Sequence, residues 1–113
     1  MSAPRVYTLL IYSSRSPDAP LSAEQEEAML EQHRALQTEA SARGELLAVA
    51  RLDASAGGPS AHGAGGRTEM IDGPYIETKE WLVGFYLLEC ASEEEAIERA
   101  KMICPIADHA IEV

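Results

Sequence analysis

Two stretches of the chain have the length and composition of β-strands with two apolar faces. Residues 6–12 read V-Y-T-L-L-I-Y and residues 81–90 read W-L-V-G-F-Y-L-L-E-C, and both are rich in β-branched and aromatic residues. Alternate residues of a strand point to opposite faces of a sheet, and in both stretches each set is mostly apolar. A sheet that helices cover on one side only would show a polar second face, so both faces are predicted to be covered. Gly84, in mid-strand, predicts a bulge or the close approach of another backbone.

Two further segments carry the start and stop signals of helices. Ser22 and Gln25 form a capping box that starts the first helix, and Gly44 stands where a left-handed C-terminal cap ends it. Ser92 and Glu95 form a second capping box, which starts a helix that ends at Pro105. The stripe of the first helix that is expected to face inward consists of Met29, His33, Leu36 and Ala40.

Three shorter strands are predicted at residues 45–53, 67–71 and 108–113. Residues 54–66 hold five of the eight glycines and are predicted to form a flexible loop, with a flap over a site as one role for it. The whole order predicts a single α+β domain over residues 1–113, a ferredoxin-like βαββαβ fold with a small extra strand between its second and third strands. Two helices cover one face of such a sheet. The other apolar face needs a partner, and we expect a homodimer formed through the sheet.

Composition then narrows the classes of partner. Nineteen acidic and nine basic residues give a net charge of −10, which repels phosphate backbones and anionic lipids, so neither nucleic acid nor a membrane surface is expected as a partner. No apolar run approaches the roughly 20 residues that span a bilayer, and the N-terminus lacks the charged and apolar blocks of a signal peptide. Cys90 and Cys104 show neither metal-ligand spacing nor a disulfide framework and are interpreted as packing residues. A cytoplasmic protein is the expectation.

Side chains that can do chemistry concentrate in one stretch. It opens with the turn Asp72-Gly73-Pro74, continues as Tyr75-Ile76-Glu77-Thr78-Lys79-Glu80, and leads directly into the strand at residues 81–90. Polar, titratable groups beside the start of an apolar strand are typical of a binding cleft. This nonapeptide, followed by Gly84-Phe85-Tyr86, resembles the signature of the YCII-related, or DGPF-domain, family.

The resemblance to the YCII-related family covers nearly the whole chain. The strand ending in Leu10-Ile11-Tyr12, the helix closed by Gly44 and the acidic second helix before a short terminal strand are all similar to that family. Tyr75 stands where the family usually has phenylalanine, and Ile76 stands where a small residue is usual, which leaves the size of a substrate and the shape of a pocket open. The resemblance implies a subunit of a dimeric α/β barrel. It also implies kinship with small isomerases and lyases that act on ring compounds without a cofactor, whereas links of some members to extracytoplasmic-function sigma factors imply a regulatory or accessory role.

The motif offers candidates for general acid–base chemistry. Asp72 is a candidate general base, or alternatively a turn-former whose carboxylate bonds backbone amides. Glu77 and Lys79 follow on an extended segment and point to one side, so Lys79 is a candidate to stabilise developing negative charge and Glu77 to bind substrate. The competing interpretation is a solvated, charged turn. Tyr75 is a further candidate to bind a ring substrate.

The histidines and tyrosines extend this list of candidates. His33, on the apolar stripe, is either a hydrogen-bonded core residue or a proton shuttle that faces the cleft, because its unperturbed pKa of about 6.5 suits that task. His109 is expected to line the interior, since Ile111 and Val113 share its face. Tyr12 and Tyr86 are candidates to bind substrate, or ordinary strand aromatics. Three scattered histidines do not predict a metal site.

Two classes of function remain open at this point. The first is an isomerase or lyase without a cofactor, in which Asp72 or His33 acts as general acid–base on a small ring compound. The second is a non-catalytic dimer that senses a ligand or regulates a partner, such as an extracytoplasmic-function sigma factor. A third interpretation makes the motif a structural latch at the dimer interface.

Overall fold

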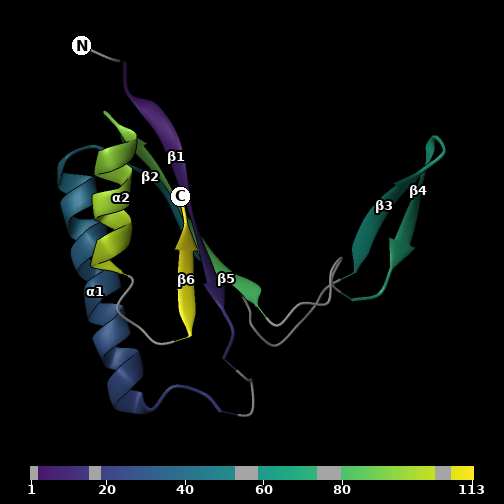
Figure 1. The fold of residues 1–113 in the computed structure, drawn as a ribbon, viewed down its shortest axis with the longest axis horizontal. Helices are drawn as coiled ribbons and strands as arrows, with labels where there is room; N and C mark the ends of the chain where they lie inside the picture. Colours follow the sequence, from purple (N-terminus) through teal and green to yellow (C-terminus); the bar gives the residue numbers. More distant parts are fainter. Residues whose placement is uncertain (1–2, 16–18, 53–58, 74–79, 104–107) are drawn as a thin grey trace.

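The computed structural model describes residues 3–15, 19–52, 59–73, 80–103 and 108–113. The elements follow in the order β1 (Arg5–Ser13), α1 (Ala23–Ala42), β2 (Leu46–Arg51), β3 (Ser60–Ala64), β4 (Arg67–Ile71), β5 (Trp81–Cys90), α2 (Glu93–Met102) and β6 (His109–Glu112) (Figure 1). Four strands form one antiparallel sheet in the order β2-β5-β1-β6. The fold is therefore α+β, and its two helices and strand order are compatible with the predicted ferredoxin-like arrangement.

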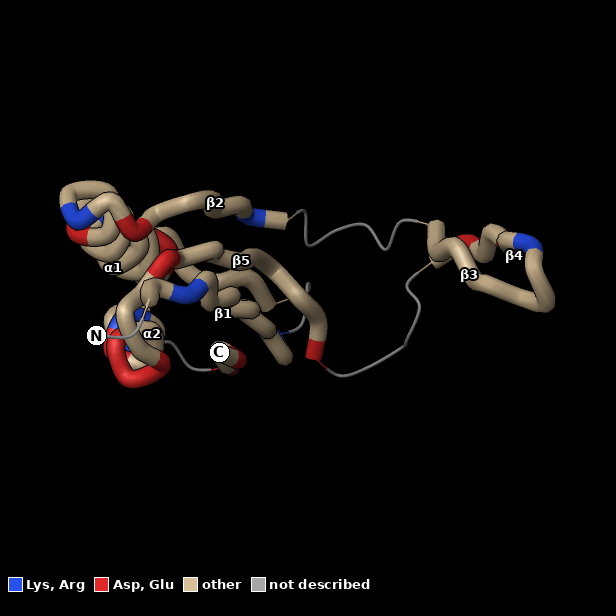
Figure 2. The backbone as a smooth tube through the Cα atoms, turned by 90° about the horizontal axis from the view of Figure 1, so that it is seen from above, with Lys and Arg blue, Asp and Glu red and all other residues tan. Residues whose placement is uncertain are grey.

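Both helices cover the same face of this sheet, which we call the inner face (Figure 2). The opposite, outer face has no covering element within the described part of the chain. The largest side chains of the core under the helices that are less than 2% exposed are Leu9, Leu36, Tyr86, Leu88 and Cys90. Burial raises the pKa of the Cys90 thiol, and the carboxylates of Glu45 and Glu95 raise it further, in keeping with a packing role.

The ends of both helices follow the predicted local chemistry. Ser22 Oγ accepts a hydrogen bond from the Gln25 backbone N–H at 3.1 Å, and the Gln25 side chain accepts from the Ser22 N–H at 3.0 Å, which completes the predicted box. Gly44, with φ of 71°, follows the last turn of α1 as predicted. At α2 the box is only half formed, because the Glu95 carboxylate accepts from the backbone of Ala91 instead of Ser92.

The connection between β2 and β5 differs from the prediction of a loop and one extra strand. β4 forms at residues 67–71 as predicted, but it pairs with β3, which takes up residues 60–64 of the predicted flexible loop. Gly65 and Gly66 make the two-residue turn, with φ of 57° and 83°. Residues 60–64 and 67–71 pair regularly on the two sides of a Gly-Gly turn, so the glycine-rich composition does not prevent a strand from forming here. The rest of the predicted loop, residues 54–58, lies outside the described residues.

The bulge and the close backbone approach that Gly84 predicts are both present. The pairing of β1 with β5 shifts register between Ile11 and Tyr12, so that β5 holds one extra residue at Val83. A Cβ at Gly84 would also stand 2.9 Å from the carbonyl oxygen of Ala50 on β2. Glycine therefore allows β2 to approach β5 closely at the point where β5 bulges.

A buried ion pair fixes α2 against the start of β2. The Arg99 guanidinium donates to the Glu45 carboxylate from Nε at 3.1 Å and from Nη2 at 3.3 Å, and both residues are buried. The hydrogen bond with Glu45 is the main cause that raises the pKa of Arg99. Removing one partner of such a pair leaves an uncompensated charge in the core, which costs far more than losing an exposed pair.

We expect the Arg99→Met substitution to lower the free energy of unfolding by about 3–5 kcal/mol, because Glu45 would keep a buried charge without its partner. The measurement is urea unfolding followed by circular dichroism. Lys101→Met is the matched control, since Lys101 lies on the same helix and pairs with Glu98 at 3.0 Å in an exposed position. The control should cost at most about 1 kcal/mol. Equal losses in the two variants would contradict the structural role of the Glu45–Arg99 pair.

Candidate functional site

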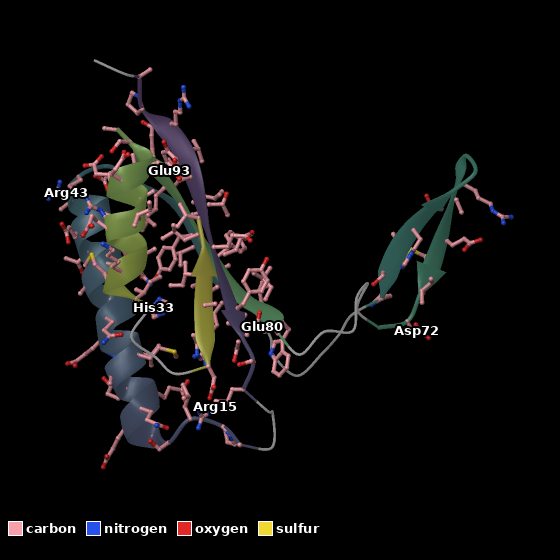
Figure 3. All side chains as sticks on the ribbon, in the orientation of Figure 1. Arg15, His33, Arg43, Asp72, Glu80 and Glu93 are labelled. Atoms are coloured by element: carbon pink, nitrogen blue, oxygen red, sulfur yellow. The ribbon has the colours of Figure 1, made fainter. Side chains whose placement is uncertain are left out.

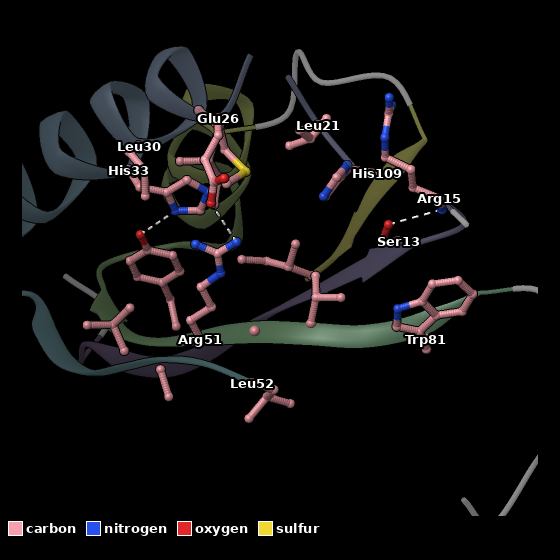
Figure 4. Close-up of a pocket in the computed structure, with 18 of the residues that line it drawn as sticks. Ser13, Arg15, Leu21, Glu26, Leu30, His33, Arg51, Leu52, Trp81 and His109 are labelled. Carbon is pink, nitrogen blue, oxygen red and sulfur yellow. Dashed lines mark hydrogen bonds and ion pairs between the residues drawn. The ribbon is translucent and has the colours of Figure 1, made fainter. Parts of the chain in front are cut away.

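A cavity of about 430 Å³ lies between α1 and the inner face of the sheet (Figure 4). Its lining comes from α1, from the C-terminal ends of β1 and β2, from the first half of β5, from the start of β6, and from residues that flank α1, α2, β1 and β2. The apolar part of this lining includes Ile11, Leu21, Met29, Leu30, Trp81 and Val83. The volume falls in the range of small-molecule sites.

The bulge in β5 determines which aromatic and aliphatic groups reach the cavity. Simple alternation from Phe85 would place Trp81 and Val83 on the outer face. The extra residue at Val83 shifts the pairing, so that Trp81 lies opposite Ser13 on the inner face, and both line the cavity. Leu82 lies opposite Tyr12 on the outer face instead. The alternation expected from the sequence therefore fails at Trp81 and Val83.

His33 is a titratable residue that α1 contributes to the lining of the cavity. Its Nδ1 lies 2.7 Å from the hydroxyl oxygen of Tyr86, and Gln37 Nε2 donates to the same oxygen at 3.2 Å. The His33 and Tyr86 rings are stacked with an interplanar angle of 13°. The Tyr86 hydroxyl can donate to Nδ1 or accept from it, so either tautomer of His33 keeps this bond. Nε2 is then the ring nitrogen that remains for a molecule in the cavity.

The electrostatic surroundings favour a neutral imidazole. Burial lowers the pKa of His33, and the positive charges of Arg51 and His109 lower it further. Burial also raises the pKa of Tyr86, against the smaller opposite effect of its hydrogen bond with Gln37. Both groups therefore hold their neutral forms, in which each can donate and accept a hydrogen bond.

Charged side chains stand at the rim of the cavity. Arg51 Nη2 lies 2.9 Å from a carboxylate oxygen of Glu26, which ties the end of β2 to the first turn of α1. Arg15 lies 3.6 Å from Asp108 and also lines the cavity. Figure 4 shows Arg51, Glu26 and His33 close together on one side, with His109 and Arg15 on the other.

The candidates from the sequence fall into three groups. His33, Tyr86 and His109 line the cavity together. Tyr12 lies on the outer face opposite Leu82, and it is not part of the cavity lining. Asp72 is exposed at the end of β4, away from His33 (Figure 3). Tyr75, Glu77 and Lys79 lie outside the described residues.

Asp72 and His33 are therefore not brought together within one chain. The backbone at Asp72 is followed by Gly73 with φ of 94°, and the Gly73 carbonyl accepts a hydrogen bond from Ser60 Oγ at 2.6 Å. These features belong to a turn that closes the base of the hairpin, which fits the turn-forming interpretation of Asp72.

Five polar residues of the cavity were not among the candidates from the sequence, and these are Ser13, Arg15, Glu26, Gln37 and Arg51. Glu26, Leu30, His33 and Gln37 recur at steps of four, three and four residues, so helical spacing alone could have placed Glu26 and Gln37 beside His33. Arg51 is harder to find, because its position depends on the register of β2 against Gly84.

Within the residues that the structure describes, no group of three or more His, Cys, Asp or Glu side chains is arranged to hold a metal ion. In the same part of the chain, neither helix has the length and apolar composition needed to cross a membrane.

Comparison with known proteins agrees with the motif and the fold. The family model described as the YCII-related domain matches residues 8–113. An uncharacterized protein of Rhizobium meliloti (strain 1021) is 36% identical over 96 residues, which cover 85% of this chain and 77% of that protein. The family match spans nearly the whole chain, including the residues of the cavity. The chain belongs to the YCII-related domain family.

Proposed function

We propose that this domain binds a small organic molecule in the cavity beside His33 and that His33 transfers a proton to or from it without a cofactor. The observation that carries the proposal is the setting of His33. Its imidazole stands on the wall of a 430 Å³ cavity, with Nδ1 engaged by Tyr86 and with its pKa lowered by burial. A neutral imidazole in a partly buried site is a suitable general base near neutral pH.

The lining indicates the kind of molecule. Apolar and aromatic walls suit a hydrocarbon ring, while Arg51 at the rim offers a positive charge to an anionic group of the same molecule. Lys79, the sequence candidate for stabilising negative charge, lies outside the described residues. Arg51 can take that role, because its side chain lies near His33 and lowers the pKa of that residue.

The proton route follows from the hydrogen bonds of His33. When Nδ1 carries the proton and donates to the Tyr86 oxygen, the Nε2 lone pair can accept a proton from a carbon of the bound molecule. The electron pair of the broken C–H bond stays on the molecule, where Arg51 faces the developing charge. Return of the proton to another carbon completes an isomerisation, and loss of a leaving group with its electron pair completes an elimination. Neither reaction needs an oxidant or a reductant.

We further propose that the functional unit is a homodimer, with the outer faces of two sheets packed together as a dimeric α/β barrel. The outer face supports this, because it carries apolar side chains on both central strands, namely Val6, Leu10, Tyr12, Leu82, Phe85 and Leu87. Val6 is 56% exposed in the single chain. Contiguous exposed apolar surface on a domain typically marks an interface.

A ligand-sensing dimer without turnover is the second candidate function, and it uses the same cavity. The ion pair of Arg51 with Glu26 supports a sensing role. A bound anion would compete with Glu26 for Arg51 and would loosen the link between β2 and α1. The two functions differ in one observable. Both predict ligand binding, and only the enzyme predicts a chemical change in the ligand.

We expect small ring-containing carboxylic acids, phenols or lactones to raise the thermal unfolding temperature of the wild type in a shift screen. A ligand at one hundred times its dissociation constant adds about 2.7 kcal/mol of stability. His33→Asn should lower the rate of any turnover about 10²–10⁴-fold, because it removes the titrating group while keeping a polar atom near the Nδ1 position.

His62→Asn is the matched control, because His62 lies on β3, outside the residues that line the cavity. It should leave both binding and turnover unchanged. Binding that survives in every variant without any turnover would favour the sensor. A ligand that binds His33→Asn and the wild type alike, with the same turnover, would contradict the role of His33.

We expect His33 to titrate below 6.5, and Arg51→Gln to move its pKa upward, because a positive charge beside the ring would be lost. NMR titration of the imidazole signals measures both values. Arg43→Gln, at the far end of α1, should leave the His33 pKa unchanged. Since the unfolded chain binds more protons between the folded pKa and about 6.5, the stability due to His33 is present above pH 6.5 and is lost as the pH falls through this window. A pKa of 6.5 or above in the wild type would refute this account.

A further inference from the structure

The hairpin of β3 and β4 stands apart from the rest of the molecule. It forms its own two-stranded sheet and shares no strand pairing with the four-stranded sheet. Figure 2 shows it beyond the outer face of that sheet, on the side away from both helices. A two-stranded hairpin on its own is marginally stable in water. Packing against another surface would therefore stabilise this hairpin.

The two faces of the hairpin differ in character. Residues that lie directly opposite each other share a face, so Ala61 with Met70 and Gly63 with Thr68 form one face, which we call the arm face. All four are exposed, none is charged, and Met70 is 64% exposed. The reverse face carries the ion pair of Arg67 with Glu69 at 3.2 Å. The reverse face also carries Ile71, which is 46% exposed, so the two faces differ in charge, and the arm face is the one without a charged residue.

The outer face of the main sheet is the second uncovered apolar surface, and the hairpin lies on the same side of the molecule (Figures 1 and 2). A second chain that packs against this outer face would occupy the space alongside the hairpin. Two-fold symmetry would place the hairpin of the second chain alongside the first in the same way. One arrangement thus covers both surfaces in both copies.

We propose that the β3–β4 hairpin is an arm that packs its arm face against a second copy of this chain. The inference rests on the homodimer proposed above and assigns to it a contact that sheet packing alone does not include. A net charge of −10 on each chain opposes association in general, so the contact has to be made by uncharged surface, which the arm face provides.

In the sequence, the hairpin lies between residues that line the cavity. The last described residue before its first connection is Leu52, and the strand after its second connection begins with Trp81. Both residues line the cavity. In the sequence, each connection of the hairpin therefore adjoins a part of the chain that contributes to the cavity lining.

The test compares Met70→Glu with Arg67→Gln in the full-length chain. Each substitution lowers the net charge by one, but the first places a charge on the arm face and the second removes one from the reverse face. Analytical ultracentrifugation measures the dissociation constant of the dimer. We expect Met70→Glu to raise that constant at least about tenfold, because a buried charge without a partner is costly. Arg67→Gln should change it less than about threefold, since exposed ion pairs contribute little.

Hydrogen exchange of the wild type gives a readout that does not depend on a variant. The backbone amides of residues 60–64 and 67–71 should exchange more slowly above the dissociation constant than below it. Circular dichroism checks that both variants keep the fold, which we expect because the hairpin lies outside the core.

The outcomes separate this inference from the proposed dimer. A wild type that is monomeric at all concentrations would overturn both. A dimer whose constant responds equally to the two substitutions, with hairpin exchange independent of concentration, would overturn the arm and leave the sheet-to-sheet dimer standing. The latter result would also follow if another protein or a membrane were the true occupant of the arm face.

Discussion

The antiparallel pairing of β1 with β5 is the interaction on which the rest of this structure depends. These strands form the middle of the sheet, and every other strand of that sheet joins one of them. Their register places Leu9 opposite Tyr86 in the core and Leu10 opposite Phe85 on the outer face. The single extra residue at Val83 then turns Trp81 inward. One ladder of backbone hydrogen bonds thus sets the core, the cavity wall and the outer face.

The close approach of β2 to Gly84 couples this ladder to the electrostatics of the site. Arg51 lies opposite Gly84, and a larger residue there would meet the Ala50 carbonyl. The same approach directs Arg51 toward Glu26 and His33. Because Arg51 helps to lower the pKa of His33, a backbone contact between two strands contributes to the protonation state of a side chain on a helix. The chemistry that we propose is therefore a consequence of sheet geometry.

Local signals in the sequence predicted most of the fold, and long-range register explains what they missed. The capping box at Ser22, the glycine cap at Gly44 and the strand at residues 81–90 depend on neighbouring residues, so the sequence alone could identify them. The bulge at Val83 depends on how β5 meets β1, and the position of Arg51 depends on how β2 meets β5. The buried pair of Glu45 and Arg99 joins residues 54 positions apart, and no local sequence pattern around either residue identifies its partner. His33 was recognised from its helical stripe, whereas its hydrogen bond to Tyr86 required the assembled sheet.

The separation of Asp72 from His33 bears on what the signature motif does. In one chain, the described part of the motif closes the base of the hairpin through the Ser60–Gly73 hydrogen bond, and the cavity is lined by residues of α1 and the inner face of the sheet. A carboxylate placed there cannot share a ligand with His33 of the same chain. The described part of the motif is instead the turn at Gly73, which closes the hairpin through that hydrogen bond. In the function that we propose, the acid–base role therefore rests on His33, and the described part of the motif belongs to the hairpin that we propose as an arm.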